Sequence, residues 1–350
     1  MSNSEAGVLK SIRDSLVLPT VPAVALAILR LAQDPRVSIE RMAESLEKDP
    51  ALAGKVLRFA NSSYYAPTSR ILSLPQAIIR IGIRRVKMLA LSFSLLDVCG
   101  QTGAHGFDFP AYWQRSLTMS VAARRIAERS TRNKVSDQAF IAALLADVGC
   151  PVLAGAFPAQ YRSVEKLVPV GQRELVELET NFIGVAHPRA SAMILEAWRL
   201  PGEFVEAVAA HHDLSLIEAD AAGFPVAIVL ATAADLADII TLGVSERRIS
   251  RLAANLRQHF AFTAQHIDLL LKDLGPEIER VGALLNVPLP QADQIHAQAK
   301  AEILKLAMQE DLAGAGQGGP DTAGTSAVST PGGGTRNAQG DGPTSGRSNP

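Results

Sequence analysis

The fold is decided around residues 140–150, which read FIAALLADVGC. Asp147 is the single charged residue in this apolar helical stretch. Outward from it, apolar side chains recur every three to four residues, as they do on one face of a helix. One such stripe consists of Val21, Val24, Ala25, Ile28 and Leu31, and another of Val86, Leu89, Ala90 and Phe93. The alternation typical of strands is nearly absent, so the sequence predicts an all-α globular protein.

The composition narrows the class of protein. Of the 350 residues, 47% are hydrophobic and 20% charged, a balance that supports a large buried core. The formal net charge of -1 leaves no basic stripe, which argues against nucleic-acid binding. Cys99 and Cys150 lack CxxC spacing, so neither a disulfide framework nor a zinc knuckle is expected. With no signal-peptide pattern and no uncharged apolar run of roughly 18 residues, a cytoplasmic protein without membrane contact is expected.

Segment boundaries are well marked along the chain. Residues 311–350 consist mainly of Gly, Pro, Ser, Thr and Ala, and such a segment cannot offset its ordering entropy, so a disordered tail is predicted there. A helix predicted at about 222–240 is apolar on nearly every face, which indicates burial. Asp49 before Pro50 is typical of a helix N-terminus, and Ser73 begins a capping-box pattern.

Four motifs keep the order and spacing of one known family. They are residues 18–22 (LPTVP), 49–53 (DPALA), 57–65 (LRFANSSYY) and 73–82 (SLPQAIIRIG), the last followed by Arg84 and Arg85. From about Ile12 to about Asp213 the sequence resembles the HDOD family, whose name denotes an output domain related to the HD hydrolases. The resemblance implies a bacterial signalling protein with an all-α fold, in a family where catalysis is often not demonstrated.

The resemblance also implies a division into lobes. Residues 1–100 would form a helical bundle specific to the family, and residues 107–245 a diverged HD lobe, with a Gly-rich joint at 100–106. Residues 246–310 are expected to form a helical extension that packs back against the HD-like lobe or, alternatively, makes a dimer surface. The tail at 311–350 completes the predicted organisation. No other signalling domain is recognisable, so the chain resembles a stand-alone output module.

The HD lobe can be compared with its relatives residue by residue. HD chemistry uses two histidines and two aspartates from separate helices to hold a metal ion that activates water. By resemblance, Arg115 stands in place of the first histidine, and Ala146-Asp147 replaces the His-Asp pair. Cys150 replaces the lysine that usually follows, and Asp235 is assigned as the last aspartate. An arginine is no metal ligand, so no catalytic residue, bound metal or cofactor is expected.

Three histidines leave an alternative open. His187, His211 and His212 lie where the related HD-GYP phosphodiesterases carry additional ligands, and they are candidates for a residual metal site with Asp147 and Asp235. Adjacent helical residues project about 100° apart, however, so His211 and His212 are not expected to share one ion. The favoured interpretation makes the histidines relics with hydrogen-bonding roles. The Gly-Tyr-Pro signature is absent, which further disfavours cyclic-dinucleotide hydrolysis.

A second candidate site lies on the predicted first lobe. It consists of Arg58, Asn61, Tyr64, Tyr65, Arg84 and Arg85, which offer guanidinium, amide and phenol groups to a partner or ligand. Arg80 and Lys87 extend it as a basic patch. The competing interpretation is that Asn61 caps its helix and the tyrosines brace the following loop. The Cys150 thiol is interpreted as part of the core.

Together these patterns favour a non-catalytic regulatory protein of bacterial signal transduction that acts by binding another protein. The alternative is a metal-dependent phosphohydrolase, or a cyclic-dinucleotide phosphodiesterase, that works through the residual His and Asp residues. A nucleotide ligand and a homodimer are open possibilities. Nucleic acid and membrane are not expected as partners, because the charge pattern and the lack of a spanning segment provide no means of binding either.

Overall fold

The chain consists of helices wherever its structure is described. The computed structural model describes residues 5–14, 24, 27–28, 31, 36–61, 69–83, 86–87, 89–90, 104, 106–165, 172–285, 297, 300–305 and 308. Within these residues every regular element is a helix and no strand occurs, so the all-α prediction is confirmed. The predicted tail at 311–350 and most of the joint at 100–106 lie outside them.

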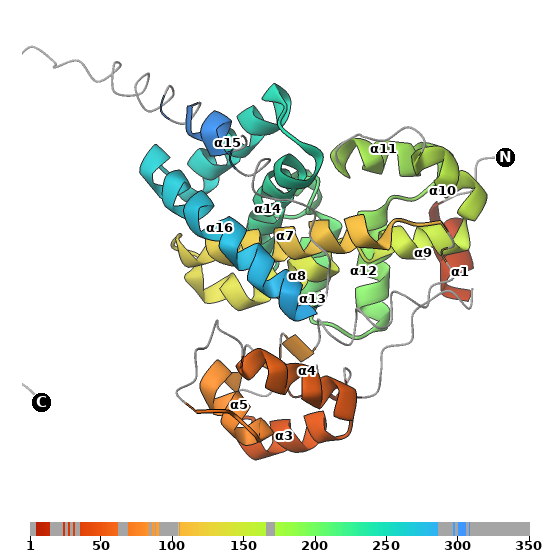
Figure 1. Ribbon diagram of the computed structural model, residues 1–350. Coiled ribbons are helices and arrows are strands. Elements are labelled where there is room, and N and C mark those ends of the chain that lie inside the picture. The colour runs from red at the N-terminus through yellow and green to blue at the C-terminus, as the bar shows by residue number, and fades with distance from the viewer. Residues whose placement is uncertain are drawn as a thin grey trace, which may run out of the picture.

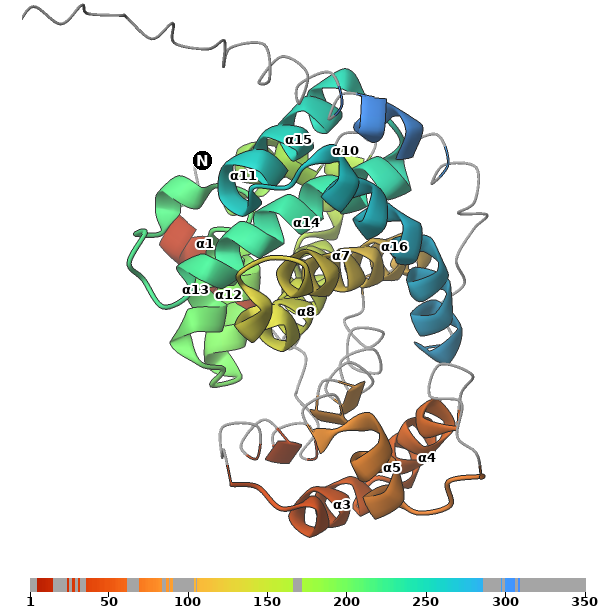
Figure 2. The ribbon, with the colours of Figure 1, turned by 90° about the vertical axis from the view of Figure 1, so that its left-hand side faces the viewer.

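A smaller body consists of three short helices, α3 (Ile39–Glu47), α4 (Pro50–Ala60) and α5 (Leu74–Ile81), which pack on one another below the rest of the molecule (Figures 1 and 2). The Asp49 carboxylate accepts from the first backbone amides of α4, and the Ser73 hydroxyl accepts from the first turn of α5. Both predicted caps are therefore confirmed, since each satisfies amides that the helix itself leaves without acceptors.

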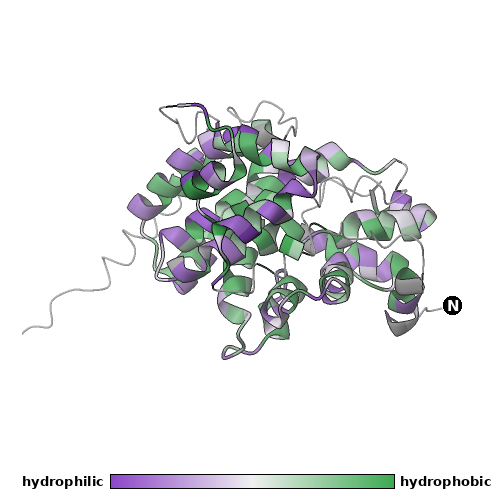
Figure 3. Ribbon diagram, turned by 90° about the horizontal axis from the view of Figure 1, so that it is seen from below, coloured by the Kyte–Doolittle hydropathy of each residue, from purple (hydrophilic) through white to green (hydrophobic). Residues whose placement is uncertain are grey.

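The larger body is built around two long neighbouring helices, α7 (Phe109–Glu128) and α14 (Phe224–Leu242). The helices around them are α8 (Ser136–Leu145), α9 (Gly149–Ala156), α10 (Pro158–Glu165), α11 (Gln172–Ile183), α12 (His187–Ala197) and α13 (Gly202–Ala209), with single 3-10 turns η1 (Asn133–Val135) and η2 (Leu214–Leu216). Of these, α8 packs against both α7 and α14, and α12 against α9 and α13. Figure 3 shows apolar residues concentrated toward the middle of this body.

Helix α14 is buried along most of its length, as predicted for the apolar segment near residues 222–240. Every residue from 226 to 240 is buried, including two aspartates. The stretches Ser136–Ala156 and Phe224–Leu242 are long and apolar enough to cross a membrane, but 83% of the most apolar 18-residue window in each is buried inside the protein. Both stretches therefore belong to the core.

Two further helices follow α14. α15 (Glu246–Phe260) packs on α14, and α16 (Ala264–Leu285) runs along α7 and also contacts α4 of the smaller body (Figure 1). Glu277 of α16 is fully buried and forms ion pairs with both Arg124 and Arg125 of α7. The extension thus packs against the HD-like lobe, one of the two arrangements expected from the sequence.

The first helix departs from the predicted division. α1 (Glu5–Asp14) packs against α9 of the larger body, and Glu5 lies 3.2 Å from Arg189 of α12 as an ion pair. Residues 1–100 therefore do not form one lobe throughout, because their first helix contributes to the second body. The remaining lobe boundaries stay predictions.

Candidate functional site

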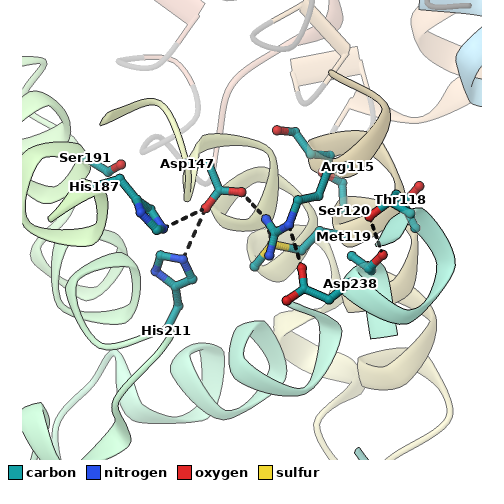
Figure 4. A network of polar contacts seen from close by, with 12 residues as sticks. Arg115, Thr118, Met119, Ser120, Asp147, His187, Ser191, His211 and Asp238 are labelled. Carbon is teal, nitrogen blue, oxygen red and sulfur yellow. Dashed lines mark hydrogen bonds and ion pairs between the residues drawn. The ribbon is translucent and has the colours of Figure 1, made fainter. Parts of the chain in front are cut away.

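Three buried charged side chains meet near the middle of the larger body (Figure 4). Arg115 of α7 donates through Nε to Oδ1 of Asp238 on α14 at 2.9 Å, and through Nη1 to Oδ2 of Asp147. Asp147 lies in the turn between α8 and α9. The side chains of all three are at most 5% exposed. The Asp147 centre, as we name it, comprises Arg115, Asp147, His187, His211, His212 and Asp238.

Electrostatics keep the arginine and Asp147 charged despite their burial. Burial by itself would raise the pKa of the Asp147 carboxyl, but the Arg115 guanidinium beside it, together with His211 and His187, outweighs burial and holds that pKa well below its usual range. Burial likewise opposes the charge on Arg115, yet Asp147 and Asp238 raise the pKa of the guanidinium above its ordinary value. Arg115 and Asp147 therefore persist as charged groups, and Asp238, 2.9 Å from Arg115 Nε, completes this ion triad.

The histidines face the other oxygen of Asp147. His187 is the first residue of α12, and its Nε2 lies 3.5 Å from Asp147 Oδ1. His211 Nε2 lies 3.3 Å from the same oxygen. One donor atom from each of Asp147, His187, His211 and His212 can be chosen so that all lie within 4.8 Å of one another. Asp147 thus contacts the arginine through one carboxylate oxygen and the imidazoles through the other (Figure 4).

The expectation that His211 and His212 diverge is wrong. Helix α13 ends at Ala209, and both histidines lie in the turn that follows, where Asp213 N–H donates to the Ala210 carbonyl at 3.0 Å. Because these residues are outside the helix, the 100° rotation per residue does not apply. Their ring centroids are 4.0 Å apart, and the His187 ring lies 5.7 and 5.2 Å from them.

The Nδ1 atoms of His187 and His211, which point away from Asp147, each face a hydrogen-bond acceptor. Nδ1 of His187 lies 2.7 Å from Oε2 of Glu179, and Nδ1 of His211 lies 2.6 Å from the Val208 carbonyl oxygen. A carbonyl oxygen only accepts, so Nδ1 of His211 carries a proton, and the Glu179 carboxylate favours the same tautomer of His187. Tyr161 in turn donates its hydroxyl to Glu179 at 3.4 Å. Both Nε2 atoms are thereby directed at Asp147.

The pKa values of these imidazoles move in opposite directions. Burial lowers the pKa of both rings, and for His211 it prevails over the hydrogen bond and charge of Asp147. For His187, neighbouring Cys150 and Glu179 outweigh burial and raise the pKa well above its usual value. The centre therefore contains one imidazole disposed to be neutral and one disposed to hold a second proton.

A glycine brings the two sides of the centre together. Gly149 begins α9, and its N–H donates to Ser191 Oγ of α12 at 2.8 Å. A Cβ atom at this position would lie 2.5 Å from the His187 carbonyl oxygen, closer than atoms can approach. Only glycine lets the turn that carries Asp147 lie directly against the first turn of α12.

Two replaced HD positions are buried without taking part in the ion triad. Ala146 is fully buried. Burial raises the pKa of the Cys150 thiol, which supports its interpretation as part of the core. The thiol nevertheless lies in a second close group, with donor atoms of Cys150, Glu179 and His187 within 4.8 Å of one another.

The assignment of Asp235 requires correction. Its carboxylate accepts from Arg251 Nε at 2.6 Å and from Asn255 Nδ2 at 2.9 Å, both on α15. Asp238, nearly one helical turn further along α14, faces Arg115 in its place. Asp235 thus helps fasten α15 to α14, and Asp238 belongs to the Asp147 centre.

The first-lobe candidates are only partly described. Tyr64, Tyr65, Arg84 and Arg85 lie outside the described residues. Arg58 is exposed on α4. The Asn61 amide, however, donates to the Leu57 and Ile71 carbonyls and accepts from Ile71 N–H, so it bridges two segments and is not available to a partner. Lys87 is buried and donates to the Leu31 carbonyl at 2.8 Å, so it is not part of an exposed basic patch.

Comparison with known proteins identifies the family. The model of the HDOD domain matches residues 18–214, more than half of the chain. The chain belongs to the HDOD family. An uncharacterised protein of Treponema pallidum (strain Nichols) is 22% identical over 197 residues, which make up 56% of this chain and 38% of that protein. The chain thus spans well under half of this curated relative.

Solved structures share the fold. An HDOD domain protein of unknown function from Geobacter sulfurreducens is 22% identical with a TM-score of 0.63, over 80% of this chain and 98% of that one. A Marinobacter aquaeolei VT8 protein, provisionally named for signal transduction, is 24% identical with a TM-score of 0.61, over 84% of this chain and 61% of that one. At these identities the likeness establishes the two-body helical fold and leaves activity to be argued from the site.

Proposed function

We propose that this HDOD chain is a non-catalytic module of bacterial signal transduction, located in the cytoplasm, that acts by binding another protein. The observation that carries the proposal is the Arg115 guanidinium, which engages both Asp147 and Asp238. HD-type hydrolysis needs a metal ion to activate water, and a guanidinium offers no lone pair to such an ion. The carboxylates are therefore occupied by a fixed charge, which supports a role other than hydrolysis.

An exposed apolar face on the smaller body supports a protein partner. Leu72 and Ile79, both large hydrophobic residues, are 73% and 69% exposed. Ile79 and Arg80 follow Gln76 by three and four residues, so these three side chains share one face of α5. The Gln76 side chain accepts from the backbone N–H of Leu72, which lies just before the helix. Apolar side chains beside an arginine are typical of contact surfaces in protein complexes.

The first test addresses this face of α5. Ile79→Glu should reduce capture of the cellular partner at least about tenfold while leaving the melting temperature unchanged, because a charge in an interface costs binding but an exposed helix position tolerates it. The matched control is Leu216→Glu, which alters an equally exposed residue (69%) of η2 on the larger body. Affinity capture from the native organism, quantified by mass spectrometry, gives the readout. Equal capture by Ile79→Glu and the wild type would refute the proposed surface.

The competing function is a metal-dependent phosphohydrolase, which the convergence of Asp147 with three histidines favours. Activity assays with Mn²⁺ and Co²⁺ separate the two functions. We expect the wild-type chain to hydrolyse cyclic dinucleotides and bis(p-nitrophenyl) phosphate no faster than the Asp147→Ala variant does. Turnover at least about 100-fold above that variant would establish the hydrolase, since a metal-activated water contributes several powers of ten in rate.

A further inference from the structure

We propose that Asp147, His187, His211 and His212 bind one divalent transition-metal ion, while Arg115 remains paired on the opposite side of Asp147. The sequence alone predicted no metal, because two HD ligands are replaced and the adjacent histidines were expected to diverge. The turn after α13 removes the second objection, since it places both rings beside His187. The replacement of two HD ligands is no obstacle either, because Oδ1 of Asp147 faces the imidazoles and only Oδ2 faces the arginine.

The orientation of the imidazoles points to a cation between them. Nδ1 of His211 faces the Val208 carbonyl and Nδ1 of His187 faces Glu179, so the Nε2 atoms of both rings are directed at Asp147 Oδ1. Two ring nitrogens and one carboxylate oxygen therefore face the same space, and a metal ion bound there would displace any proton that the rings hold between them. Nε2 of His187 is buried without a hydrogen-bond partner among the described atoms, as a ligand atom awaiting an ion would be.

The outer hydrogen bonds match those of metal-binding histidines. Such a histidine almost always donates its other ring N–H to a carboxylate or a backbone carbonyl, which fixes the tautomer and the ring orientation. His187 uses the carboxylate of Glu179, and His211 uses the carbonyl of Val208. Tyr161 and the His187 backbone N–H hold the Glu179 carboxylate in turn. Glu179 is therefore a positioning residue for the proposed ligand.

Distances and charge also suit an ion. The two imidazole nitrogens lie 3.3 and 3.5 Å from Asp147 Oδ1, close to the roughly 3.4 Å edge of a tetrahedron whose metal–ligand bonds are about 2.1 Å. Three acidic side chains, Asp147, Asp238 and Glu179, surround the imidazoles, and Arg115 is the one guanidinium paired with them in the centre. This excess of acidic groups favours a bound cation.

The donor set selects the class of ion. Three imidazole nitrogens and one carboxylate oxygen suit Zn²⁺, Co²⁺ or Fe²⁺ far better than Mg²⁺ or Ca²⁺, which prefer oxygen donors. The ion would fasten the α8–α9 turn, the start of α12 and the turn after α13 to one another. His212 is the most exposed of the four ligands at 7%, so exchange with solvent would proceed from its side.

Titration of the chelator-treated full chain with CoCl₂ provides the test. We expect about one Co²⁺ per chain, visible ligand-field absorption, resistance to excess Mg²⁺ and displacement by Zn²⁺. A hundredfold excess over the dissociation constant should raise the melting temperature by roughly 5 °C. Failure of the folded wild-type chain to bind Co²⁺ in stoichiometric amount, or ready displacement by Mg²⁺, would overturn the proposal whatever the variants do.

Three variants form a graded series. His212→Ala should weaken Co²⁺ binding more than about 100-fold, Glu179→Gln by roughly 10-fold, and His259→Ala, outside the centre, not at all. Circular dichroism of the metal-free proteins checks folding. Retention of full affinity by His212→Ala would overturn the ligand set. Hydrolysis by the Co²⁺-loaded chain would refute the non-catalytic function and leave the metal site standing, so the two proposals fail separately.

Discussion

Helix α7 carries two buried arginine–carboxylate clusters with different surroundings. Toward its N-terminal half, Arg115 meets Asp147 and Asp238, and Asp147 also faces two imidazole nitrogens. Toward its C-terminal end, Arg124 and Arg125 converge on Glu277 of α16. The second cluster contains arginines and carboxylates alone, and its Arg124 guanidinium also lies over the Phe140 ring, 5.5 Å from its centroid.

The difference teaches that a buried ion pair alone does not identify a functional site. The Glu277 cluster joins two helices, and opposite charges satisfy one another within it. The Asp147 centre adds imidazoles, a kind of side chain that can exchange protons and bind metals, and it directs two of them at a carboxylate oxygen that the arginine does not use. The histidines, and not the salt bridges, therefore set the Asp147 centre apart.

The largest effect on stability is expected from Asp147→Ala. Removal of one carboxylate leaves the buried Arg115 with half of its compensation, so the free energy of unfolding should fall by about 3–5 kcal/mol. Urea denaturation followed by circular dichroism measures the change. The exposed Asp220 offers a matched control, and Asp220→Ala should change stability by less than about 0.5 kcal/mol. Similar effects of the two variants would mean that the triad is not maintained in solution.

A middle-sized effect should follow from Glu277→Gln. The amide keeps the shape of the side chain but loses the charge that faces Arg124 and Arg125, so the free energy of unfolding should fall by about 1.5–3 kcal/mol. Co²⁺ binding by the folded variant should be unchanged, because Glu277 is not part of the Asp147 centre. A loss of Co²⁺ affinity in this variant would break the distinction between the two clusters.

The smallest effect is expected at the exposed end of the same helix. Arg129 pairs with Asp273 of α16, but their side chains are 26% and 46% exposed. Water and salt screen such a pair, so Arg129→Ala should lower the free energy of unfolding by less than about 1 kcal/mol. Thermal melts at low and high salt should then differ little between the variant and the wild type. A loss as large as that of Glu277→Gln would mean that exposure does not govern these contacts.

Much of the fold was predictable from local patterns. The caps at Asp49 and Ser73 depend on neighbouring residues, and the all-round apolar character of α14 follows from its composition. The family could be identified from four short motifs that keep their order and spacing. The position of α1 against α9 was not predictable, because it depends on contacts between segments that are far apart in sequence.

The directions in which the Asp235 and Asp238 side chains point could not be predicted from the sequence. An apolar stripe determines how a helix is rotated about its own axis, because the stripe faces the core. Helix α14 is buried on all faces and has no such stripe. Either aspartate could therefore face Arg115. The outcome depends on Arg251 and Asn255, which arrive from the next helix and bind Asp235.

The histidine turn and Glu179 were missed for other reasons. No Gly or Pro marks the end of α13, so the sequence contains no signal that the helix ends before His211 and His212. Asp213, which caps η2 through Ser215 N–H, was the available signal that a new element begins there. Glu179 lies eight residues before His187, a spacing that carries no helical meaning across the intervening turn.

The shared carboxylate of Asp147 has a thermodynamic consequence. Because Oδ2 pairs with α7 and Oδ1 faces α12 and the turn after α13, whatever changes the charge on the imidazole side changes the strength of the arginine pair. Thermodynamic linkage makes this effect reciprocal. If a partner that binds on α7 or α16 displaces Arg115 and so changes the affinity of a ligand at the histidines by some factor, that ligand changes the affinity of the partner by the same factor. Through this one carboxylate, the arginine of α7 and the imidazoles of α12 and of the turn after α13 act on one another electrostatically.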